Sequence, residues 1–438
     1  MHSGPRRRIE GFDLLLLVAA NAVVVVGLWW RQGGLGDMDD LAGTLTSLGR
    51  VTGLLGAFLA LVELLLLARV PVVDMLGLDR VGAWHRWNGT ACLALIAAHT
   101  VLVTAGYAVA DDAGVLDETG DLLSDYSGVL LATIALGLLI AVVATSVVAV
   151  RRRLGYRTWH ALHVLAYVAV ALAFSHQLAT GQEFQRQPVA RAYWWALYAA
   201  TLAAILGSRV VVPLARSLRH GLRVERVVRE APGVVSIEIG GRDLDRLPAL
   251  SGQFLQWRFL ARGHWMEAHP FSLSAAPGGQ RLRITVKELG DYTARLGELP
   301  AGTRVIVEGP YGRLTRAARR RPRAVLIAGG VGIAPIRALL EDMPGEIAVI
   351  YRAGREDDLL FRDELDELSA RRGAPVHYVI GERGGDSLLS STHLCELVPD
   401  IADRDVYVCG PVSMTEATRA SLRGAGVPAR QIVSEAFG

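Results

Sequence analysis

Hydrophobic residues follow two different patterns along the chain, and the change comes near residue 220. The first half carries long apolar runs separated by short polar loops, whereas the second half carries short runs in which apolar and polar residues alternate. Each long run is near the ~20 residues that an α-helix needs to cross a bilayer. Six such runs lie at about 12–30, 45–68, 83–107, 127–150, 158–178 and 192–214. The pattern predicts an all-α six-helix membrane bundle over residues 1–220, followed by soluble domains.

The loops between these runs alternate in charge, which predicts how the chain crosses the membrane. One set of loops is basic and contains Arg6, Arg7, Arg8, Arg69, Arg80, Arg151, Arg152, Arg153, Arg157, Arg216, Arg219 and Arg223. The other set is acidic and contains Asp37, Asp39, Asp40, Asp111, Asp112, Asp117, Glu118, Asp121 and Asp125. Because cytoplasmic loops carry the excess of lysine and arginine, we expect a multi-pass cell-membrane protein with both termini in the cytoplasm.

Composition narrows the class of protein. With 51% hydrophobic residues, the chain is too apolar for an ordinary soluble protein of 438 residues. No small-residue cleavage site follows the first apolar run, so we expect a retained membrane helix rather than a signal peptide. The net charge of +3 comes with no nucleic-acid-binding signature, and the cysteines Cys92, Cys395 and Cys409 form no iron–sulfur pattern.

Two of the apolar runs each carry a pair of histidines, which are costly in a membrane and usually functional there. In the third run 14 residues separate His85 from His99, and in the fifth run 13 residues separate His163 from His176. At a rise of 1.5 Å per residue, each gap places the two rings ~20 Å apart along the helix. Two metal centres can therefore be stacked across the membrane, and neutral imidazole is an axial ligand of haem iron. We expect His85 to pair with His163 near the cytoplasmic face, and His99 with His176 near the outer face.

The spacing in the fifth run does not fit a straight helix. A gap of 14 residues returns to within ~40° of the same helix face, but a gap of 13 misses that face by ~140°. The fifth helix must bend, be locally rewound, or send its two histidines to the haems from different sides.

Two further charged residues lie within the second run. Arg50, near its expected outer end, is a candidate catalytic residue, as a partner for a haem propionate or a reduced oxygen species. The alternative is an interfacial arginine whose charge reaches back to water. Glu63, near the inner end of the run, is open to the same two interpretations.

The pattern of strands and turns from residue 221 to about 318 predicts an antiparallel β-barrel. Three features within it are candidate flavin contacts. The segment His269, Pro270, Phe271 and Ser272 places an aromatic face and a hydroxyl on one strand. Residues Gly290, Asp291, Tyr292 and Thr293 open a short helix whose N–H groups can hold a pyrophosphate. Lys287, just upstream, adds a positive charge.

Residues 319–438 alternate strands with helices, which predicts an α/β nucleotide-binding domain. A glycine-rich turn joins the first strand to its helix, and its candidate contacts are Gly329, Gly330, Gly332, Ile333 and Pro335. Arg352 and Arg355 follow the next strand and favour the 2′-phosphate of NADPH over NADH, although Glu356 comes directly afterwards.

A later strand brings Cys409, Gly410 and Pro411 to the expected carboxyl edge of this sheet, where ligands bind. We expect Cys409 to lie near the nicotinamide, and a buried structural cysteine is the alternative.

These motifs occur in the order found in the NADPH oxidase/ferric reductase superfamily, which the whole chain resembles. The resemblance implies two b-type haems on the four histidines, FAD on His269 to Ser272 with Ser272 near the flavin ring, and the flavin pyrophosphate at Gly290 to Thr293. It places NADPH across Gly329 to Pro335, Arg352 and the loop from Cys409 to Pro411. It also implies that Phe437 stacks on the flavin until the nicotinamide displaces it.

The chain departs from the animal oxidases of this family at one position of the supposed oxygen site. Those enzymes carry a further histidine one turn after the outer-haem ligand, where this chain has Val103, whereas their arginine is matched by Arg50. The supposed oxygen-reduction site of the family is therefore at best half present in this chain. There is also no EF-hand pattern before the membrane domain and no ferredoxin-like cysteine cluster after the reductase domains.

Three functions compete on this basis. The first is an NADPH oxidase that makes superoxide, and the second is a ferric-chelate reductase with the same electron path. The third, from a different class, is a membrane transporter or sensor with a regulatory nucleotide-binding module. The expected partners are NADPH, the lipid bilayer, and oxygen or a ferric chelate as acceptor. Partner subunits are left open.

Overall fold

The computed structural model describes residues 11–68, 78–151, 153–185, 187–381 and 388–437. Its chain divides into two compact units, Met1–Arg209 and Val210–Gly438. The basic residues Arg6, Arg7, Arg8, Arg69 and Arg152, used above to predict the orientation in the membrane, lie outside the described residues.

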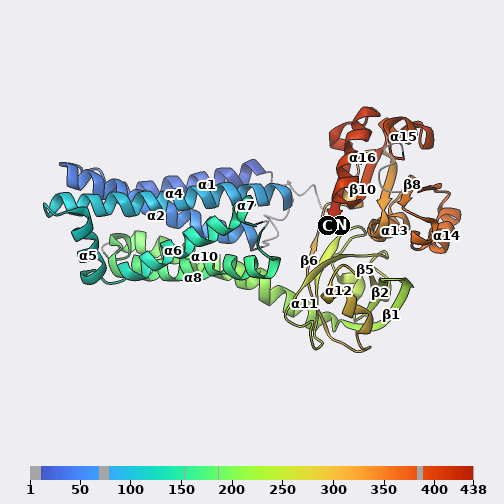
Figure 1. Ribbon diagram of the computed structural model, residues 1–438, viewed down its shortest axis with the longest axis horizontal. Helices are drawn as coiled ribbons and strands as arrows, with labels where there is room; N and C mark the ends of the chain where they lie inside the picture. Colours follow the sequence, from blue (N-terminus) through green and yellow to red (C-terminus); the bar gives the residue numbers. More distant parts are fainter. Residues whose placement is uncertain (1–10, 69–77, 152, 186, 382–387, 438) are drawn as a thin grey trace, which may run out of the picture. The chain divides into compact units, whose positions relative to one another are not determined.

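The first unit is built of helices (Figure 1). Its described helices are α1 (Gly11–Arg31), α2 (Leu41–Leu67), α4 (Leu78–Ala110), α5 (Val115–Asp125), α6 (Val129–Ser146), α7 (Val148–Arg151), α8 (Tyr156–Thr180), α9 (Gln182–Gln185) and α10 (Pro188–Leu206). Among the described residues, six helices are long and apolar enough to cross a membrane, which confirms the six predicted runs. A helix suits this role because it satisfies its own backbone hydrogen bonds where no water is available.

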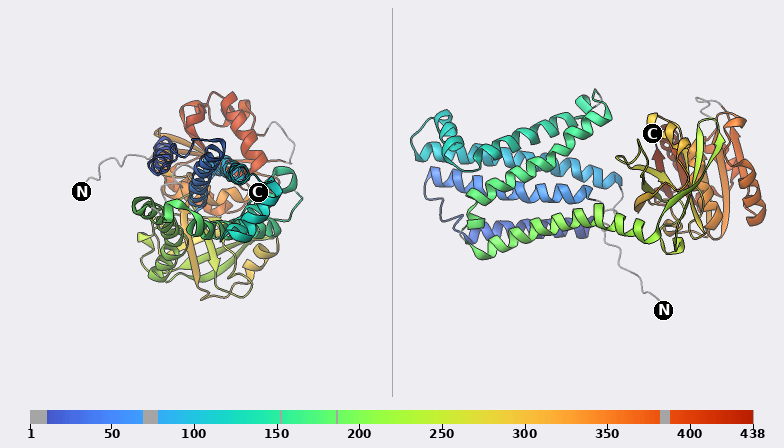
Figure 2. Two further views of the ribbon diagram at one scale, coloured as in Figure 1. Left: turned by 90° about the vertical axis from the view of Figure 1, so that its left-hand side faces the viewer. Right: turned by 90° about the horizontal axis from the view of Figure 1, so that it is seen from below.

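The long helices run side by side in the right view of Figure 2, and two pairs of them pack closely, α2 with α4 and α6 with α8. Glycines allow the first contact. A Cβ atom at Gly53 would come 2.6 Å from Nδ1 of His99, and one at Gly56 would come 2.8 Å from the side chain of Ile96. Small residues at these positions therefore let the α2 backbone approach α4 and the ring of His99.

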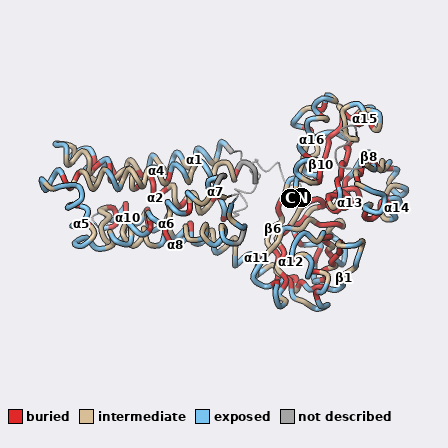
Figure 3. The backbone as a smooth tube through the Cα atoms, viewed as in Figure 1, coloured by how far each residue is buried: buried red, intermediate tan, exposed pale blue. Residues whose placement is uncertain are grey.

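The second unit begins with α11 (Val212–His220) and two antiparallel three-stranded sheets. One sheet has the order β1-β2-β5, formed by Arg223–Ala231, Val234–Gly240 and Arg281–Lys287. The other has the order β4-β3-β6, formed by His269–Ser272, Phe254–Phe259 and Val305–Tyr311. The side chains of Ile237, Trp257 and Ile284 are fully buried in their common core, which is red in Figure 3.

The predicted closed barrel is wrong, because the two sheets are open. In the described residues, only isolated bridges join them, between Arg223 and Arg304 and between Leu273 and Ile284. Strand β4 has four residues, and Pro270 among them has no N–H group to donate. The edge of β4 that faces β5 is therefore too short to form a continuous ladder.

The last part is a five-stranded parallel sheet with the order β11-β10-β7-β8-β9, which confirms the predicted α/β domain. Its elements are β7 (Arg323–Gly329), α13 (Ile333–Asp342), β8 (Glu346–Ala353), α14 (Arg362–Arg372), β9 (Val376–Ile380), α15 (Ser391–Leu397), β10 (Asp405–Pro411), α16 (Val412–Gly424) and β11 (Ile432–Phe437). Helices α13 and α14 contribute to the core on one face, and α15 and α16 to the core on the other. The strand order reverses between β7 and β10, and ligands of such sheets bind beyond the carboxyl ends of the strands at that point.

Candidate functional site

The four membrane histidines form two facing pairs between α4 and α8. The ring centres of His85 and His163 are 5.9 Å apart, and those of His99 and His176 are 6.4 Å apart. Helices α4 and α8 run in the same direction, because the earlier histidine of one faces the earlier histidine of the other. The backbones of these two helices do not pack closely on each other, so the imidazoles span the distance between them.

The unequal histidine spacing is accommodated without a break in α8, which is one continuous α-helix. Thirteen residues turn an α-helix by about 220° beyond three full turns, so His163 and His176 leave α8 on different sides. Both rings still reach their partners because α8 is set apart from α4. The spacing allowed a bend, a local rewinding, or histidines that leave the helix on different sides. The structure has the third arrangement.

One ring nitrogen, Nδ1, of each histidine lies against a polar group of the bundle. Nδ1 of His99 is 2.8 Å from the carbonyl oxygen of Gly49, and Nδ1 of His85 is 2.7 Å from Oε1 of Glu63, although off the line of a well-directed hydrogen bond. The two α8 histidines meet hydroxyls, since Nδ1 of His163 is 3.2 Å from Oγ of Ser146 and Nδ1 of His176 is 3.2 Å from Oγ1 of Thr180. Such contacts fix the tautomer and leave Nε2 as the ligating atom.

These pairs fit a metal bound between two imidazoles. Metal–imidazole bonds are about 2 Å long. A metal bonded to both rings would lie about 2 Å from each ligating nitrogen, and each nitrogen lies about 1 Å from its ring centre. The two ring centres would then be about 6 Å apart. Within the described residues no group of three or more potential metal-ligating side chains is found. Each histidine pair would therefore suit haem iron, which needs few protein ligands, better than a free ion.

Arg50 is held by two carboxylates. Its Nη1 is 3.0 Å from Oδ2 of Asp37, and its Nη2 is 3.3 Å from Oε1 of Glu183, which is almost completely buried. Arg50 follows Gly49, whose carbonyl oxygen contacts His99. Arg50 is therefore the residue after a contact of the second histidine pair, and the charge of its guanidinium is already compensated.

In the second unit, the two segments expected to hold the flavin meet. The ring of His269 stacks on that of Tyr292, with centres 3.8 Å apart, and Trp257 Nε1 donates to the carbonyl oxygen of Phe271 over 2.9 Å. Pro270 and Ser272 complete this strand, with Pro270 exposed and Ser272 partly buried. Burial raises the pKa of Tyr292 to about 12, so its phenol remains a donor. Its hydroxyl is buried and has no partner among the described residues, which fits a polar ligand at this position.

The segment expected to bind the pyrophosphate opens a short helix, as predicted. Helix α12 covers Asp291–Ala294 and continues into a 3-10 turn, Arg295–Glu298. The hydroxyl of Thr293 accepts hydrogen bonds from the N–H groups of Leu289 and Gly290, at 2.8 and 3.1 Å. Lys287 ends strand β5 and is exposed close to this turn.

The glycine-rich turn and the Cys409 segment lie side by side at the switch point of the parallel sheet. A Cβ atom at Gly332 would come 2.3 Å from the carbonyl oxygen of Cys409, and one at Gly329 would come 2.1 Å from Sδ of Met414. Gly330 adopts φ +53°, a conformation that favours glycine. Ile333 and Pro335 are buried in the first turn of α13, which follows this turn directly.

Phe437 lies beside Pro411 in the register of β10 and β11, and Glu435 lies beside Cys409. Burial raises the pKa of the Cys409 thiol well above its usual range, so this cysteine stays protonated. Glu435 was not recognised from the sequence. Only its place two residues before Phe437 could have marked it, because its contacts are with Arg313 and Leu314, far away in the chain.

The two arginines expected to choose between the nucleotides differ in exposure. Arg352 pairs with Gly329 in the register of β7 and β8, at the same edge of the sheet, and is partly buried. Arg355 lies beyond the strand with 80% of its side chain exposed, and its Nε is 3.9 Å from Oδ2 of Asp358.

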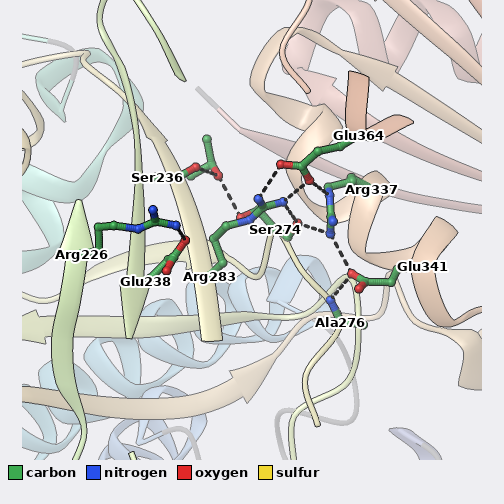
Figure 4. Close-up of polar contacts among 10 residues, drawn as sticks. Arg226, Ser236, Glu238, Ser274, Ala276, Arg283, Arg337, Glu341 and Glu364 are labelled. Carbon is green, nitrogen blue, oxygen red and sulfur yellow. Dashed lines mark hydrogen bonds and ion pairs between the residues drawn. The ribbon is translucent and has the colours of Figure 1, made fainter. Parts of the chain in front are cut away.

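An ion-pair network links the flavin-side sheets to the nucleotide-side helices (Figure 4). Arg283 of β5 binds both carboxylate oxygens of Glu364 on α14, at 2.8 and 2.9 Å. Arg337 of α13 contacts Glu364 through Nε at 2.5 Å and donates from Nη1 to the carbonyl oxygen of Ser274 over 3.1 Å. Burial alone would raise the pKa of Glu364, but Arg283 and Arg337 lower it. Because Ser274 lies two residues after Ser272 and Arg337 two after Pro335, the network joins the two cofactor segments.

Three sequence families match successive parts of the chain. Residues 52–174 match the ferric reductase like transmembrane component, residues 234–315 match an FAD-binding domain, and residues 326–420 match an oxidoreductase NAD-binding domain. The first match contains His85, His99 and His163, and it ends two residues before His176. The FAD-binding match contains the segments from His269 to Thr293, and the NAD-binding match contains those from Gly329 to Pro411.

Curated relatives share only part of the chain. A flavohemoprotein of Pseudomonas putida is 33% identical over 238 residues, which are 50% of this chain and 60% of that protein. NADH-cytochrome b5 reductase 1 of Cryptococcus neoformans is 29% identical over 187 residues, which are 38% of this chain and 64% of that protein. The chain thus spans less than two thirds of the length of these relatives.

Among solved structures, the FAD/NAD-binding domain of a nitric oxide dioxygenase from Vibrio cholerae has a TM-score of 0.42 at 24% identity, covering 50% of this chain and 98% of that one. A ferredoxin–NADP+ reductase from Neisseria gonorrhoeae has a TM-score of 0.41 at 19% identity, covering 49% of this chain and 97% of that one.

The order of the family matches confirms the resemblance first drawn from the motifs. The chain combines a ferric-reductase-type transmembrane component with FAD-binding and NAD-binding domains, which is the domain architecture of the ferric reductase/NADPH oxidase superfamily.

Proposed function

We propose that this protein carries electrons from cytoplasmic NADPH across the cell membrane to an acceptor on the outer face. The proposal is carried by one observation. Two helices able to span a bilayer present two sets of facing imidazoles, His85 with His163 and His99 with His176. When bound, FAD supplies the conversion of a hydride into single electrons, and two b-type haems supply a one-electron path.

The residues of the chain would divide the work by position. The four histidines would hold the haems through Nε2, while the groups at Nδ1 keep each ring oriented. His269, Phe271 and Tyr292 would hold the flavin, with the hydroxyl of Ser272 near its ring. The turn from Gly329 to Pro335 would hold the pyrophosphate of NADPH, with Arg352 and Arg355 toward the 2′-phosphate.

At the carboxyl ends of β10 and β11, Phe437 would cover the flavin until the nicotinamide displaces it. Cys409 would line the nicotinamide position as a neutral thiol. This assignment is supported by the neighbouring placement of Pro411 and Phe437.

The acceptor is proposed to be a ferric chelate rather than oxygen. Arg50, the residue expected to attract a reduced oxygen species, is compensated by Asp37 and Glu183. Arg50 therefore offers no uncompensated positive charge to stabilise the negative charge that oxygen gains when it becomes superoxide. Val103 also stands where the animal oxidases of the family carry a histidine.

The test is NADPH-driven reduction of the purified full-length protein in lipid vesicles. Under anaerobic conditions, NADPH should bleach the flavin and produce the absorption bands of reduced b-type haem. With acceptors added, ferric citrate should be reduced at the rate of NADPH use, with no effect of superoxide dismutase. Superoxide formed at the rate of NADPH use would instead identify an oxidase. Absence of haem bands would favour a transporter or sensor with a regulatory nucleotide site.

A further inference from the structure

The four haem-facing histidines differ in the group that contacts Nδ1. His99 meets a backbone carbonyl oxygen, and the two histidines of α8 meet hydroxyls. These three groups are neutral. His85 alone among the four meets a carboxylate, that of Glu63 on α2, with Oε1 2.7 Å from Nδ1.

The carboxylate of Glu63 is held in this position from α4. Asn88 Nδ2 donates to Oε2 of Glu63 over 2.7 Å and also lies 2.9 Å from the carbonyl oxygen of Leu59. Gly89 makes room for it, because a Cβ atom there would come 2.8 Å from Oε1. A carboxylate in a membrane span is costly. This one is kept against a single histidine ring by the hydrogen bond from Asn88 and the space left by Gly89.

Within the described part of the chain, no lysine or arginine forms an ion pair with Glu63. At the other histidine pair, the carboxylates of Asp37 and Glu183 contact Arg50, and Nδ1 of His99 meets the carbonyl oxygen of Gly49 instead. Glu63 is therefore the carboxylate that lies directly against a ring of the four histidines.

We propose that Glu63 is a positioning residue that gives the site of His85 and His163 a lower reduction potential than the site of His99 and His176. A carboxylate at Nδ1 makes an imidazole a stronger donor to iron, and this favours the oxidised metal, which carries the greater positive charge. Electrons would then move spontaneously from the site proposed to lie near NADPH to the site near the acceptor. The inference rests on the proposed function, and it assigns a direction to the proposed electron path through the two histidine sites.

The test is a potentiometric titration of the purified full-length protein, followed through the visible bands of b-type haem. The wild type should show two one-electron components. In Glu63→Gln, which keeps an acceptor for Asn88, the lower midpoint should rise and the gap between the two should narrow, with haem content unchanged. Gly89→Ala should shift the lower midpoint in the same direction by displacing the carboxylate. The lower midpoint of Glu63→Asp should lie between that of the wild type and that of Glu63→Gln.

The matched control is Asp37→Asn, which also replaces a carboxylate of this bundle by an amide but lies on Arg50. It should leave the lower midpoint in place. Unchanged midpoints in both Glu63→Gln and Gly89→Ala, with full haem content, would overturn the inference while leaving the proposed function intact. A wild-type preparation free of haem would overturn the proposed function, and the inference with it.

Discussion

Glu435 shows how the surroundings of one residue set a response to pH. Its Oε1 accepts hydrogen bonds from the N–H groups of Arg313 and Leu314, at 2.7 and 3.2 Å. Burial nevertheless raises the pKa of this carboxyl above its ordinary value. A raised folded-state pKa means that the folded protein holds the proton more tightly than the unfolded chain. Its contribution to stability is therefore complete below the unfolded pKa of about 4.3 and is lost as pH rises through the folded pKa.

Glu435→Gln should remove this loss, because its amide oxygen can still accept both N–H groups. The melting temperature of the variant relative to wild type should be higher at pH 8 than at pH 4, measured on the full-length protein in detergent. Glu238→Gln is the control with the opposite sign, since Arg226 lowers the pKa of Glu238 and its stabilisation is lost toward acid pH. A melting-temperature difference for Glu435→Gln that does not vary with pH would contradict this account.

Gly332 is the glycine whose replacement should most directly disturb nucleotide binding. An added methyl group would collide with the carbonyl oxygen of Cys409 at 2.3 Å and push the glycine-rich turn away from β10. Gly332→Ala should weaken NADP+ binding about tenfold, or ~1.4 kcal/mol, measured by equilibrium titration of the full-length protein. Gly279→Ala, where an added Cβ meets nothing within 4 Å, should bind like wild type. Equal affinities in the two variants would show that the close approach does not support the site.

At the scale of elements, the network around Glu364 determines how the flavin strand and the nucleotide helix are held together (Figure 4). Arg337→Met keeps the length of the side chain but removes the bonds to Glu364, Glu341 and Ser274. Because hydride transfer depends on sub-ångström placement, it should slow about tenfold while NADPH affinity changes little. Stopped-flow flavin reduction with NADPH and with its 4-deuterated form measures this, and the isotope effect should grow as transfer becomes limiting.

Arg226→Gln provides the comparison for that experiment. Arg226 and Glu238 form a 2.6 Å ion pair between two strands of one sheet, and the pair does not reach the nucleotide-side helices. Its loss should leave hydride transfer unchanged. If both variants slowed flavin reduction equally, the effect would be a general loss of stability rather than of placement.

The periodicity of apolar residues predicted the type of most helices and strands. It did not predict whether the strands close into a barrel or which distant elements contact one another. Long apolar runs and strand–helix alternation define helices and a parallel sheet locally, and both predictions are confirmed. Closure of a barrel depends on the register between strands far apart in the chain, and the short strand at Pro270 does not provide it. Arg337 and Glu435 were missed for a similar reason. Their partners Glu364 and Arg313 are 27 and 122 residues away, and no local pattern marks them.

At the scale of the whole molecule, the membrane unit contains two closely packed helix pairs, α2 with α4 and α6 with α8, and the paired histidines connect α4 with α8. Sequence spacing suggested which histidines belong together, but the 13-residue gap could not be placed on a straight helix. The structure accommodates it through the separation of α4 and α8, which is a property of the assembled bundle and not of either helix. The proposed electron path therefore depends on two distinct sites, each built from both helices.

Haem content per polypeptide, measured on purified full-length variants that remain monodisperse, tests this central claim most directly. Wild type should contain two b-type haems, and His99→Ala, His176→Ala and the double variant of the two should each contain one. The double variant His99→Ala with His163→Ala should contain none, because it removes one ligand from each pair. Two haems in the His99→Ala and His176→Ala double variant, or none in the wild type despite an adequate haem supply, would contradict the account.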